Sequence, residues 1–448
     1  MLKYKIGVVS LGCAKNLVDT EVMLGLLSKE GFGITNDPAA ADILIVNTCG
    51  FIESAKQESI ENILELARYK EVGSCKLLIV TGCLAERYKD EVVKEIPEVD
   101  AVVGTGNYHE IAEVIGEAFK GSKVLKYGNP DYTPEEGLPR FQSTPSYTAY
   151  LKISDGCDNH CTYCIIPKLR GKYRSRTIED VATEARQLSE QGVKELIIIA
   201  QDTTRYGMDI YGEHKLHELL NELCRIENIK WLRLHYCYPE DITEELIETI
   251  AAQEKVCNYL DIPIQHSSNY ILKKMGRRGT REKLIDLLSR IRSRIPDVAI
   301  RTSIIVGFPG ESEQHFKELE EFIQDIKFDR MGVFKYSQEE DTPAAEFEGQ
   351  VSEEVKQQRY ERLMYLQSKI SKEINQNKIN KLYEVLVEGY DGKTNCYYGR
   401  TYADSIDIDG KVFFNSKTTL KPGDFVKVLV KKAVNYDLIG EISNESCK

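Results

Sequence analysis

Short apolar runs alternate with helical patterns in two separate blocks of the chain, and this alternation restricts the fold more than any other feature. In residues 1–120, the apolar runs are 5–10, 42–47, 76–81 and 100–104, with helical patterns between them. Short β-rich runs separated by helices are typical of a parallel sheet that helices cover on both faces. We therefore expect an N-terminal parallel α/β sheet domain over residues 1–120.

The second block repeats the strand–helix pattern six times. It follows residues 121–146, which are rich in proline and glycine, lack periodicity and predict a linker. Candidate strands lie at 149–154, 195–200, 231–236, 259–264, 300–306 and 330–336, and the last helical pattern spans 352–375. Six units are too few for a closed eight-fold barrel. Residues 147–376 therefore favour an open (β/α)6 partial TIM barrel, with a doubly wound sheet as the alternative.

Residues 378–446 change to short alternating strands, among them 383–389 and 425–430, with Asp409-Gly410 as a hairpin turn. Several short strands in so small a region predict a small, OB-like β-barrel. The expected fold class is thus a multidomain α/β protein with a β-barrel at its end.

Composition narrows the cellular setting of these 448 residues. No apolar run approaches the roughly 20 residues of a membrane span, and the N-terminus lacks a secretory signal, so we expect a cytoplasmic protein without membrane contact. The net charge of −12 suits a basic partner better than non-specific binding of nucleic acid. Twelve cysteines in a reducing compartment indicate metal binding or catalysis rather than disulfides.

One cysteine trio, Cys157, Cys161 and Cys164, has C-x3-C-x2-C spacing and follows the first predicted barrel strand. That position is the rim where such barrels carry their active sites. Thiolates favour iron–sulfur clusters or zinc. No fourth cysteine lies nearby, and three ligands on a four-iron cubane would leave one iron open. The alternatives are a zinc knuckle with His160 as fourth ligand, or three cysteines that pack in the core.

A second trio is dispersed along the sequence. Cys13, Cys49 and Cys83 each follow one of the first three predicted strands. Because the carboxyl ends of parallel strands lie along one edge of a sheet, the three thiols are expected to converge there on a shared metal site. Coincidental buried cysteines, without a shared site, are the alternative. Neighbouring glycines would allow close backbone approach, at positions Gly12, Gly50 and Gly82.

Five basic residues alternate directly after the Cys157–Cys164 loop. They form either a solvated surface or a contact with a carboxylate or phosphate of a cofactor or substrate. These residues are Lys168, Arg170, Lys172, Arg174 and Arg176.

The trio at Cys157, Cys161 and Cys164, with Tyr163 before its last cysteine, resembles the signature of radical S-adenosylmethionine (SAM) enzymes. With the dispersed trio and the terminal β-barrel, the whole chain resembles the radical SAM methylthiotransferases, whose tail is the TRAM domain. Residues 10–19 (SLGCAKNLVD) and 47–55 (NTCGFIESA) resemble the RimO type, which modifies an aspartate of small-subunit ribosomal protein S-twelve. The tRNA type, MiaB, usually reads GCQMN at the first cysteine, where this chain has GCAKN.

The resemblance implies two 4Fe–4S clusters, one on each trio. The cluster on Cys157, Cys161 and Cys164 would cleave SAM to a radical that abstracts hydrogen from the aspartate β-carbon. The other cluster would present the sulfur, and a second SAM would donate the methyl group. Tyr163 would contact adenine. Gln265 and Arg301 would contact the ribose and carboxylate of SAM, unless they serve packing or a structural ion pair.

The implied partners are ribosomal protein S-twelve, an electron donor and a sulfur source, with RNA contact through the TRAM domain as a further expectation. Two alternatives stay open. One is the same chemistry on a tRNA adenosine, as in the MiaB type. The other is a non-enzymatic iron–sulfur protein that binds RNA or senses redox state.

Overall fold

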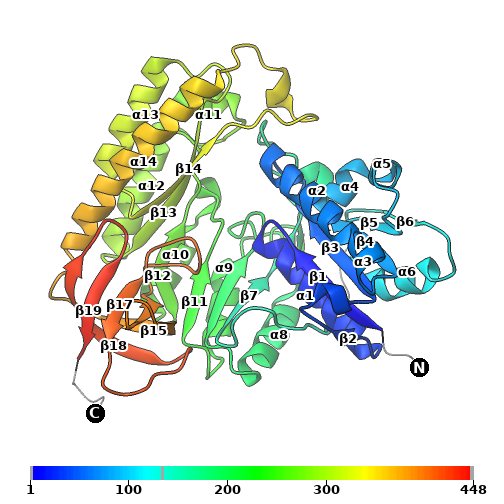
Figure 1. The fold of residues 1–448 in the computed structure, drawn as a ribbon. Coiled ribbons are helices and arrows are strands. Elements are labelled where there is room, and N and C mark those ends of the chain that lie inside the picture. Colours follow the sequence, from blue (N-terminus) through cyan, green and yellow to red (C-terminus); the bar gives the residue numbers. More distant parts are fainter. Residues whose placement is uncertain (1–3, 133–135, 444–448) are drawn as a thin grey trace.

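The computed structural model describes residues 4–132 and 136–443, which form three sheet-based parts (Figure 1). The first part is a six-stranded parallel sheet with the order β2-β1-β3-β4-β5-β6. Its strands are β1 (Lys5–Ser10), β2 (Gly33–Ile34), β3 (Ile43–Thr48), β4 (Leu77–Gly82), β5 (Ala101–Val103) and β6 (Val124–Lys126).

Helices cover both faces of this first sheet, as the sequence predicts. On one face lie α1 (Ala14–Lys29) and α6 (Ile111–Ala118), which share a core with the sheet. The other face carries α2 (Glu53–Ala67), α3 (Tyr69–Val72), α4 (Cys83–Tyr88) and α5 (Asp90–Glu95). Short 3-10 turns are η1 (Pro38–Ala40) and η2 (Tyr108–Glu110).

Two strands of this sheet escaped the sequence analysis because each is only two or three residues long. They are β2, and β6 at Val124–Lys126, which pairs with β5. The β6 strand lies beyond residue 120, inside the segment 121–146 that we expected to be only a linker. The sheet is therefore longer than predicted, while the domain boundaries themselves stay predictions.

The central part is a parallel sheet with the order β14-β13-β12-β11-β10-β7, so its strands follow one another in sequence without a switch. That order excludes a doubly wound sheet. Among the described residues the edge strands β7 and β14 do not pair, which confirms an open six-unit barrel. The strands are β7 (Thr148–Lys152), β10 (Glu195–Ile199), β11 (Trp231–Leu234), β12 (Val256–Asp261), β13 (Ala299–Val306) and β14 (Arg330–Lys335).

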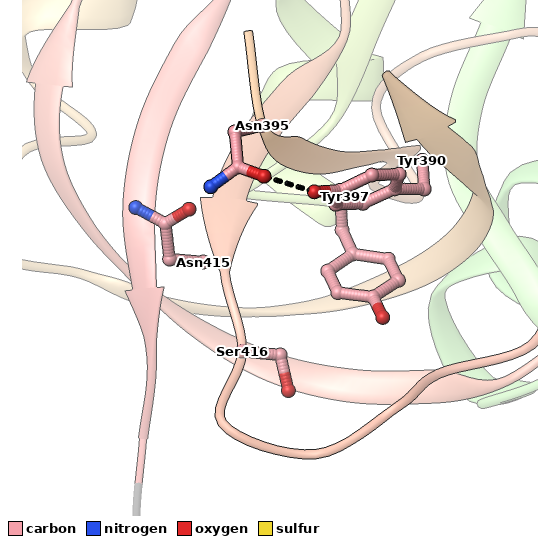
Figure 2. Close-up of a pocket in the computed structure, with 5 residues that line it drawn as sticks. All are labelled: Tyr390, Asn395, Tyr397, Asn415 and Ser416. Atoms are coloured by element: carbon pink, nitrogen blue, oxygen red, sulfur yellow. Dashed lines mark hydrogen bonds between the residues drawn. The ribbon is translucent and has the colours of Figure 1, made fainter. Parts of the chain in front are cut away.

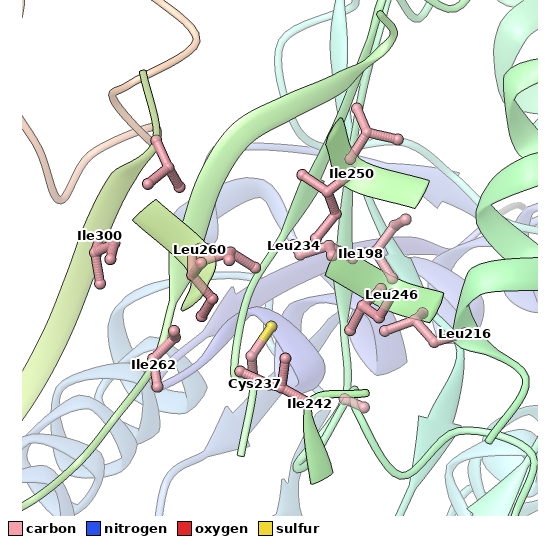
Figure 3. Close-up of a cluster of buried hydrophobic side chains, with 14 of the residues drawn as sticks. Ile198, Leu216, Leu234, Cys237, Ile242, Leu246, Ile250, Leu260, Ile262 and Ile300 are labelled. Carbon is pink, nitrogen blue, oxygen red and sulfur yellow. The ribbon is translucent and has the colours of Figure 1, made fainter. Parts of the chain in front are cut away.

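The helices of the central part pack on one face of its sheet (Figure 1). They are α8 (Ile178–Glu190), α9 (Leu216–Cys224), α10 (Glu244–Ala252), α12 (Arg281–Arg294), α13 (Glu313–Ile326) and α14 (Glu353–Gln376). Figure 3 shows part of this core, in which Ile198, Leu234, Leu260 and Ile300 from four adjacent strands belong to the same apolar cluster as Leu246 of α10. Smaller elements are β8 (Ser154–Asp155), β9 (Arg174–Ser175), α7 (Ile166–Arg170), α11 (Asn269–Lys274), η3 (Pro239–Asp241) and η4 (Pro343–Glu346).

One central strand lies three residues earlier than predicted. We expected a strand at 259–264, but β12 ends at Asp261. Pro263 has no N–H to donate to a neighbouring strand, so the apolar run continues past the end of the pairing.

The C-terminal part is a closed five-stranded barrel with the order β15-β16-β17-β19-β18, as the sequence predicts. Its own apolar core includes Val385, Phe414 and Val428. The strands are β15 (Leu382–Asp391), β16 (Cys396–Arg400), β17 (Val412–Asn415), β18 (Phe425–Ala433) and β19 (Leu438–Ile442). The last residues of the predicted range, 444–446, lie outside the described residues.

Asp409-Gly410 is not a hairpin turn, so that prediction is wrong. Strands β16 and β17 are joined by residues 401–411, which we call the plug segment. This segment enters the concave face of the central sheet, where Ser405 Oγ lies 2.8 Å from His235 Nε2 and Asp409 accepts a hydrogen bond from Tyr259. Leu232 and Leu234 face the helices, so the alternate residues Arg233 and His235 point toward the plug segment.

The C-terminal barrel covers the amino ends of the strands of the central sheet. Tyr147, Trp231 and Ala299 at those ends pack against Leu386 and Ala403. The N-terminal part lies toward the carboxyl ends of these strands. Val18 of its helix α1 packs against Ile197 and Ile199 of β10. Throughout the described ranges, no helix is both long and apolar enough to cross a membrane.

Candidate active site

The N-terminal sheet brings Cys13, Cys49 and Cys83 together. They follow β1, β3 and β4, which are neighbours in the sheet. The thiols of Cys13 and Cys49 are close enough to Cys83 to raise its pKa, which burial raises first, to about 11. Cys13 is exposed, Cys49 half-buried and Cys83 buried, so the group opens toward the protein surface on the Cys13 side.

Gly12 makes this convergence sterically feasible. Its φ of +84° favours glycine, and a Cβ placed there would lie 2.7 Å from Cys49 Cβ. Gly50 and Gly82 lie equally near neighbouring backbone, as expected from the sequence. A larger residue at position 12 would push the first two cysteines apart.

The second trio lies on the loop between β8 and α7, at the carboxyl end of β7. The thiols of Cys157 and Cys161 both raise the pKa of Cys164, although burial is the larger cause. The loop is fixed to the rim, because Asn159 Nδ2 donates a 2.8 Å hydrogen bond to Asp202. Tyr238 Oη lies 3.9 Å from Cys161 Sγ. The local sequence motif therefore reaches the rim of the barrel, as predicted.

The donor sets suit iron–sulfur clusters. In the described part of the chain, no three Cys, His, Asp or Glu side chains converge on a single metal ion. In a four-iron cubane each cysteine binds a different iron, so its ligands stand farther apart than those of one ion. His160, the fourth ligand that a zinc knuckle would require, is exposed. Each trio supplies three thiols, the donor type that iron–sulfur clusters use, and its role as a cluster site stays a prediction.

The loop that carries the second trio contacts the first trio at the interface between the N-terminal part and the central barrel. Ile165, directly after Cys164, packs with Cys83, Phe51 and Leu169 in one apolar cluster. Through α7, the loop that carries the second trio therefore touches a cysteine of the first. This contact joins segments about 80 residues apart in sequence.

Arg170, at the end of α7, is the residue that links the first trio electrostatically to the central barrel. It is 2% exposed and forms ion pairs with Asp19 (2.8 Å) and Asp155 (3.1 Å). Its guanidinium also lies near the thiols of Cys13 and Cys83, whose charged forms it favours. For Arg170, a solvated surface is therefore wrong, and the carboxylates that it contacts belong to the protein itself.

Of the three predicted SAM contacts, Tyr163 and Gln265 follow the carboxyl ends of strands, whereas Arg301 is the third residue of β13. Tyr163 packs edge-on against Phe308, with ring centroids 6.4 Å apart. Gln265 follows β12 with a φ of +68° and bridges to Ile304 of β13. Arg301 pairs with Asp261 at 2.9 Å and with Asp409 of the plug segment at 3.7 Å. Arg301 thus takes part in an ion pair within the protein, and its contact with SAM stays a prediction.

Sequence reasoning missed Lys15 as a member of this region. Its ammonium lies 3.3 Å from the centre of the Tyr236 ring, at the carboxyl end of β11. One signal was available, because a cation in the first turn of a helix is opposed by the helix dipole and needs another reason to be there.

Comparison with known proteins agrees with the division of the chain into three parts. The sequence matches models of the uncharacterized protein family UPF0004 over residues 5–104, the radical SAM superfamily over 151–323 and the TRAM domain over 379–442. The structure is similar to the radical S-adenosylmethionine methyltransferase TsrM from Kitasatospora setae, with a TM-score of 0.57 at 17% identity over 77% of this chain and 74% of that one. At such identity the likeness shows the fold alone.

Curated relatives match over full length. The ribosomal protein uS12 methylthiotransferase RimO of Clostridioides difficile is 53% identical over 98% of this chain and 99% of its own. The proteins of the same name from Clostridium botulinum and Acetivibrio thermocellus are each 54% identical over 100% of both chains. These matches confirm the resemblance found in the sequence, and the chain belongs to the RimO family of ribosomal protein uS12 methylthiotransferases.

Proposed function

We propose that this chain inserts a methylthio group at the β-carbon of an aspartate of ribosomal protein uS12, with one SAM as radical source and one as methyl donor. The observation that carries this proposal is the contact of Ile165, directly after Cys164, with Cys83 of the first trio. Arg170, five residues farther along the chain, lies beside the thiols of Cys13 and Cys83. A reaction that joins a carbon radical to a sulfur needs both sources at one place.

Cys157, Cys161 and Cys164 would hold the 4Fe–4S cluster that binds SAM, and Cys13, Cys49 and Cys83 would hold the cluster that presents sulfur. When bound, these groups supply the radical and the sulfur that amino-acid side chains cannot provide. Tyr163, Gln265 and Arg301 are the proposed SAM contacts, on adenine, ribose and carboxylate.

The residues of the chain itself place these groups and balance their charge. Arg170 sets a buried cation beside the first trio, and Asp19 and Asp155 hold that cation in position. The apolar cluster of Phe51, Ile165 and Leu169 keeps water from the contact between the trios.

The remaining partners belong to the same proposal. We place the reaction in the cytoplasm, with an electron donor and a sulfur source as further partners. RNA contact through the TRAM barrel is supported by a surface pocket of about 250 Å³ lined by Tyr390, Asn395, Tyr397, Asn415 and Ser416 (Figure 2). Tyr390 is half exposed and its ring lies 5.0 Å from that of Tyr397. Exposed aromatic rings with amides beside them suit the stacking of unpaired bases.

The test is reconstitution of the chain with iron and sulfide under anaerobic conditions, followed by incubation with SAM, dithionite and either uS12 or tRNA. We expect mass spectrometry to find a methylthio gain on one aspartate of uS12. Modification of tRNA but not of uS12 would favour the MiaB-type alternative and overturn this proposal. Absence of 5′-deoxyadenosine would favour a non-enzymatic iron–sulfur protein.

A further inference from the structure

Lys15 is a buried cation without a carboxylate partner in the described part of the chain. It lies in the first turn of α1, two residues after Cys13, and is 7% exposed. The neighbouring buried cations are all neutralised: Lys152 and Arg170 by Asp19 and Asp155, and Arg140 by Glu21 and Glu184. An ammonium group removed from water attracts an anion strongly, because the interior screens charge poorly.

The surroundings of Lys15 hold its ammonium group in one place. It rests 3.3 Å above the centre of the Tyr236 ring, which packs with Val18, Ile197 and Ile199 in an apolar cluster. Tyr236 itself has a φ of +60°, which is unfavourable for an aromatic residue. Strained backbone of this kind is concentrated at functional sites, where the rest of the fold maintains it.

Lys15 is also connected to both trios by short series of contacts. On one side is Cys13, whose thiol interacts with the ammonium group. On the other side, the carbonyl of Tyr236 accepts a hydrogen bond from Thr203, whose neighbour Asp202 holds Asn159 of the second trio's loop. The ammonium group therefore belongs to the region in which the N-terminal part and the loop of the second trio approach each other.

We propose that Lys15, seated on Tyr236, binds the carboxylate of the target aspartate. This inference rests on the proposed function and adds the residue that recognises the substrate. The β-carbon of aspartate is bonded directly to its carboxyl carbon, so a fixed carboxylate also fixes the reacting carbon. A charge-assisted hydrogen bond from the ammonium group supplies both the affinity and the orientation. The rival role for Lys15 is to neutralise the group held by Cys13.

The experiment measures binding rather than turnover. Labelled uS12, and a uS12 variant with asparagine at the target aspartate, are titrated with the reconstituted full chain without reductant, and fluorescence anisotropy gives each Kd. The chains compared are wild type, Lys15→Met, which replaces the ammonium group by an unbranched apolar side chain, and Lys15→Gln. Lys29→Met, an exposed position at the other end of α1, is the matched control. Iron is measured in every sample.

We expect the wild-type chain and Lys29→Met to bind the aspartate form at least about tenfold more tightly than the asparagine form, as a hydrogen bond between charged groups predicts. In Lys15→Met and Lys15→Gln this ratio should fall to about one. An unchanged ratio in both Lys15 variants overturns the inference. So does a loss of about half the iron with the ratio unchanged, which would assign Lys15 to the group on Cys13. If the wild-type chain neither binds nor modifies uS12, the proposed function itself fails, a result distinct from either of these.

Discussion

At the scale of single residues, Arg170 is the most constrained charge of the site. Its guanidinium is buried with two carboxylates, on Asp19 of the N-terminal part and Asp155 of the barrel. We expect Arg170→Met to lower the free energy of unfolding by about 3 kcal/mol, because the carboxylates stay buried when one of their cations is lost. Urea denaturation of the metal-free chain measures this. Arg225→Met, at a side chain that is 77% exposed, is the control and should change it little. Equal stability of Arg170→Met and wild type would contradict the buried pairing.

The presence of two separate trios leads to a prediction about the iron content of the chain. The reconstituted chain should hold about eight irons, and Cys49→Ala about four, because one ligand of three is lost from the dispersed trio only. Iron analysis with absorption spectroscopy measures both. Cys396→Ala, half-buried in the C-terminal barrel, should keep about eight. A Cys49→Ala chain with full iron would remove Cys49 from the metal site.

The sequence allowed the grouping of the six cysteines into two trios to be predicted, but not the charges around them. Cys13, Cys49 and Cys83 could be grouped because strand ends of a parallel sheet share an edge. Lys15 and Arg170 could not be assigned, since their partners come from another part of the chain. Tyr236 is 221 residues from Lys15, and Asp19 is 151 residues from Arg170. No periodicity or spacing links positions so far apart.

At the scale of elements, the plug segment explains charges that a barrel interior would not otherwise tolerate. Glu195 of β10 pairs with Arg233 of β11 at 2.9 Å and with Arg400, directly before the plug segment, at 2.6 Å. Asp404 of the plug segment pairs with Arg330 of β14. In sequence, the alternation in β11 predicts that Arg233 and His235 leave the helix layer, but not that a distant loop buries them.

Because of His235, the free energy of unfolding depends on pH. Burial lowers the pKa of His235 to about 4, below its usual value of about 6.5, while Ser405 Oγ contacts its Nε2 atom. Between these pH values the unfolded chain binds a proton that the folded chain does not, so stability falls as the pH drops from about 6.5 to 4.

We therefore expect wild type to lose about 3 kcal/mol more than His235→Asn over this pH range. Chemical denaturation at several pH values measures the difference. His217→Asn, on the half-exposed side of α9, should follow wild type. Parallel pH profiles of wild type and His235→Asn would show that His235 titrates normally.

At the scale of the whole molecule, the C-terminal barrel is part of the central fold rather than an appendage. It covers Trp231 and Tyr259, and its plug segment neutralises Arg330. A chain that ends at residue 377 should therefore melt at a lower temperature than the full chain, or be insoluble, because apolar surface and a buried arginine are uncovered. Thermal unfolding followed by circular dichroism measures this. An unchanged melting temperature would mean that the barrel is only tethered.

Repeating patterns made the order of the three parts predictable, whereas their contacts were not. The six central strands are apolar runs separated by helical patterns, and the strands of the C-terminal barrel alternate apolar and polar residues, so both could be found from the sequence. Strand β6 is too short for a periodic signal, and Asp409-Gly410 has the composition of a hairpin turn although it lies in the plug segment. Short elements and inter-part contacts depend on tertiary packing, which local sequence does not record.

The spacing of the cysteines has a consequence for biogenesis. Cys157, Cys161 and Cys164 span eight residues, so the three thiols of an unfolded chain can come together on iron before the protein folds. Cys13, Cys49 and Cys83 span 71 residues and meet only after β1, β3 and β4 have aligned. We therefore expect the trio at Cys157, Cys161 and Cys164 to bind iron first and the dispersed trio to bind it after folding. Mild denaturant should release iron from the dispersed trio while the other trio keeps its iron.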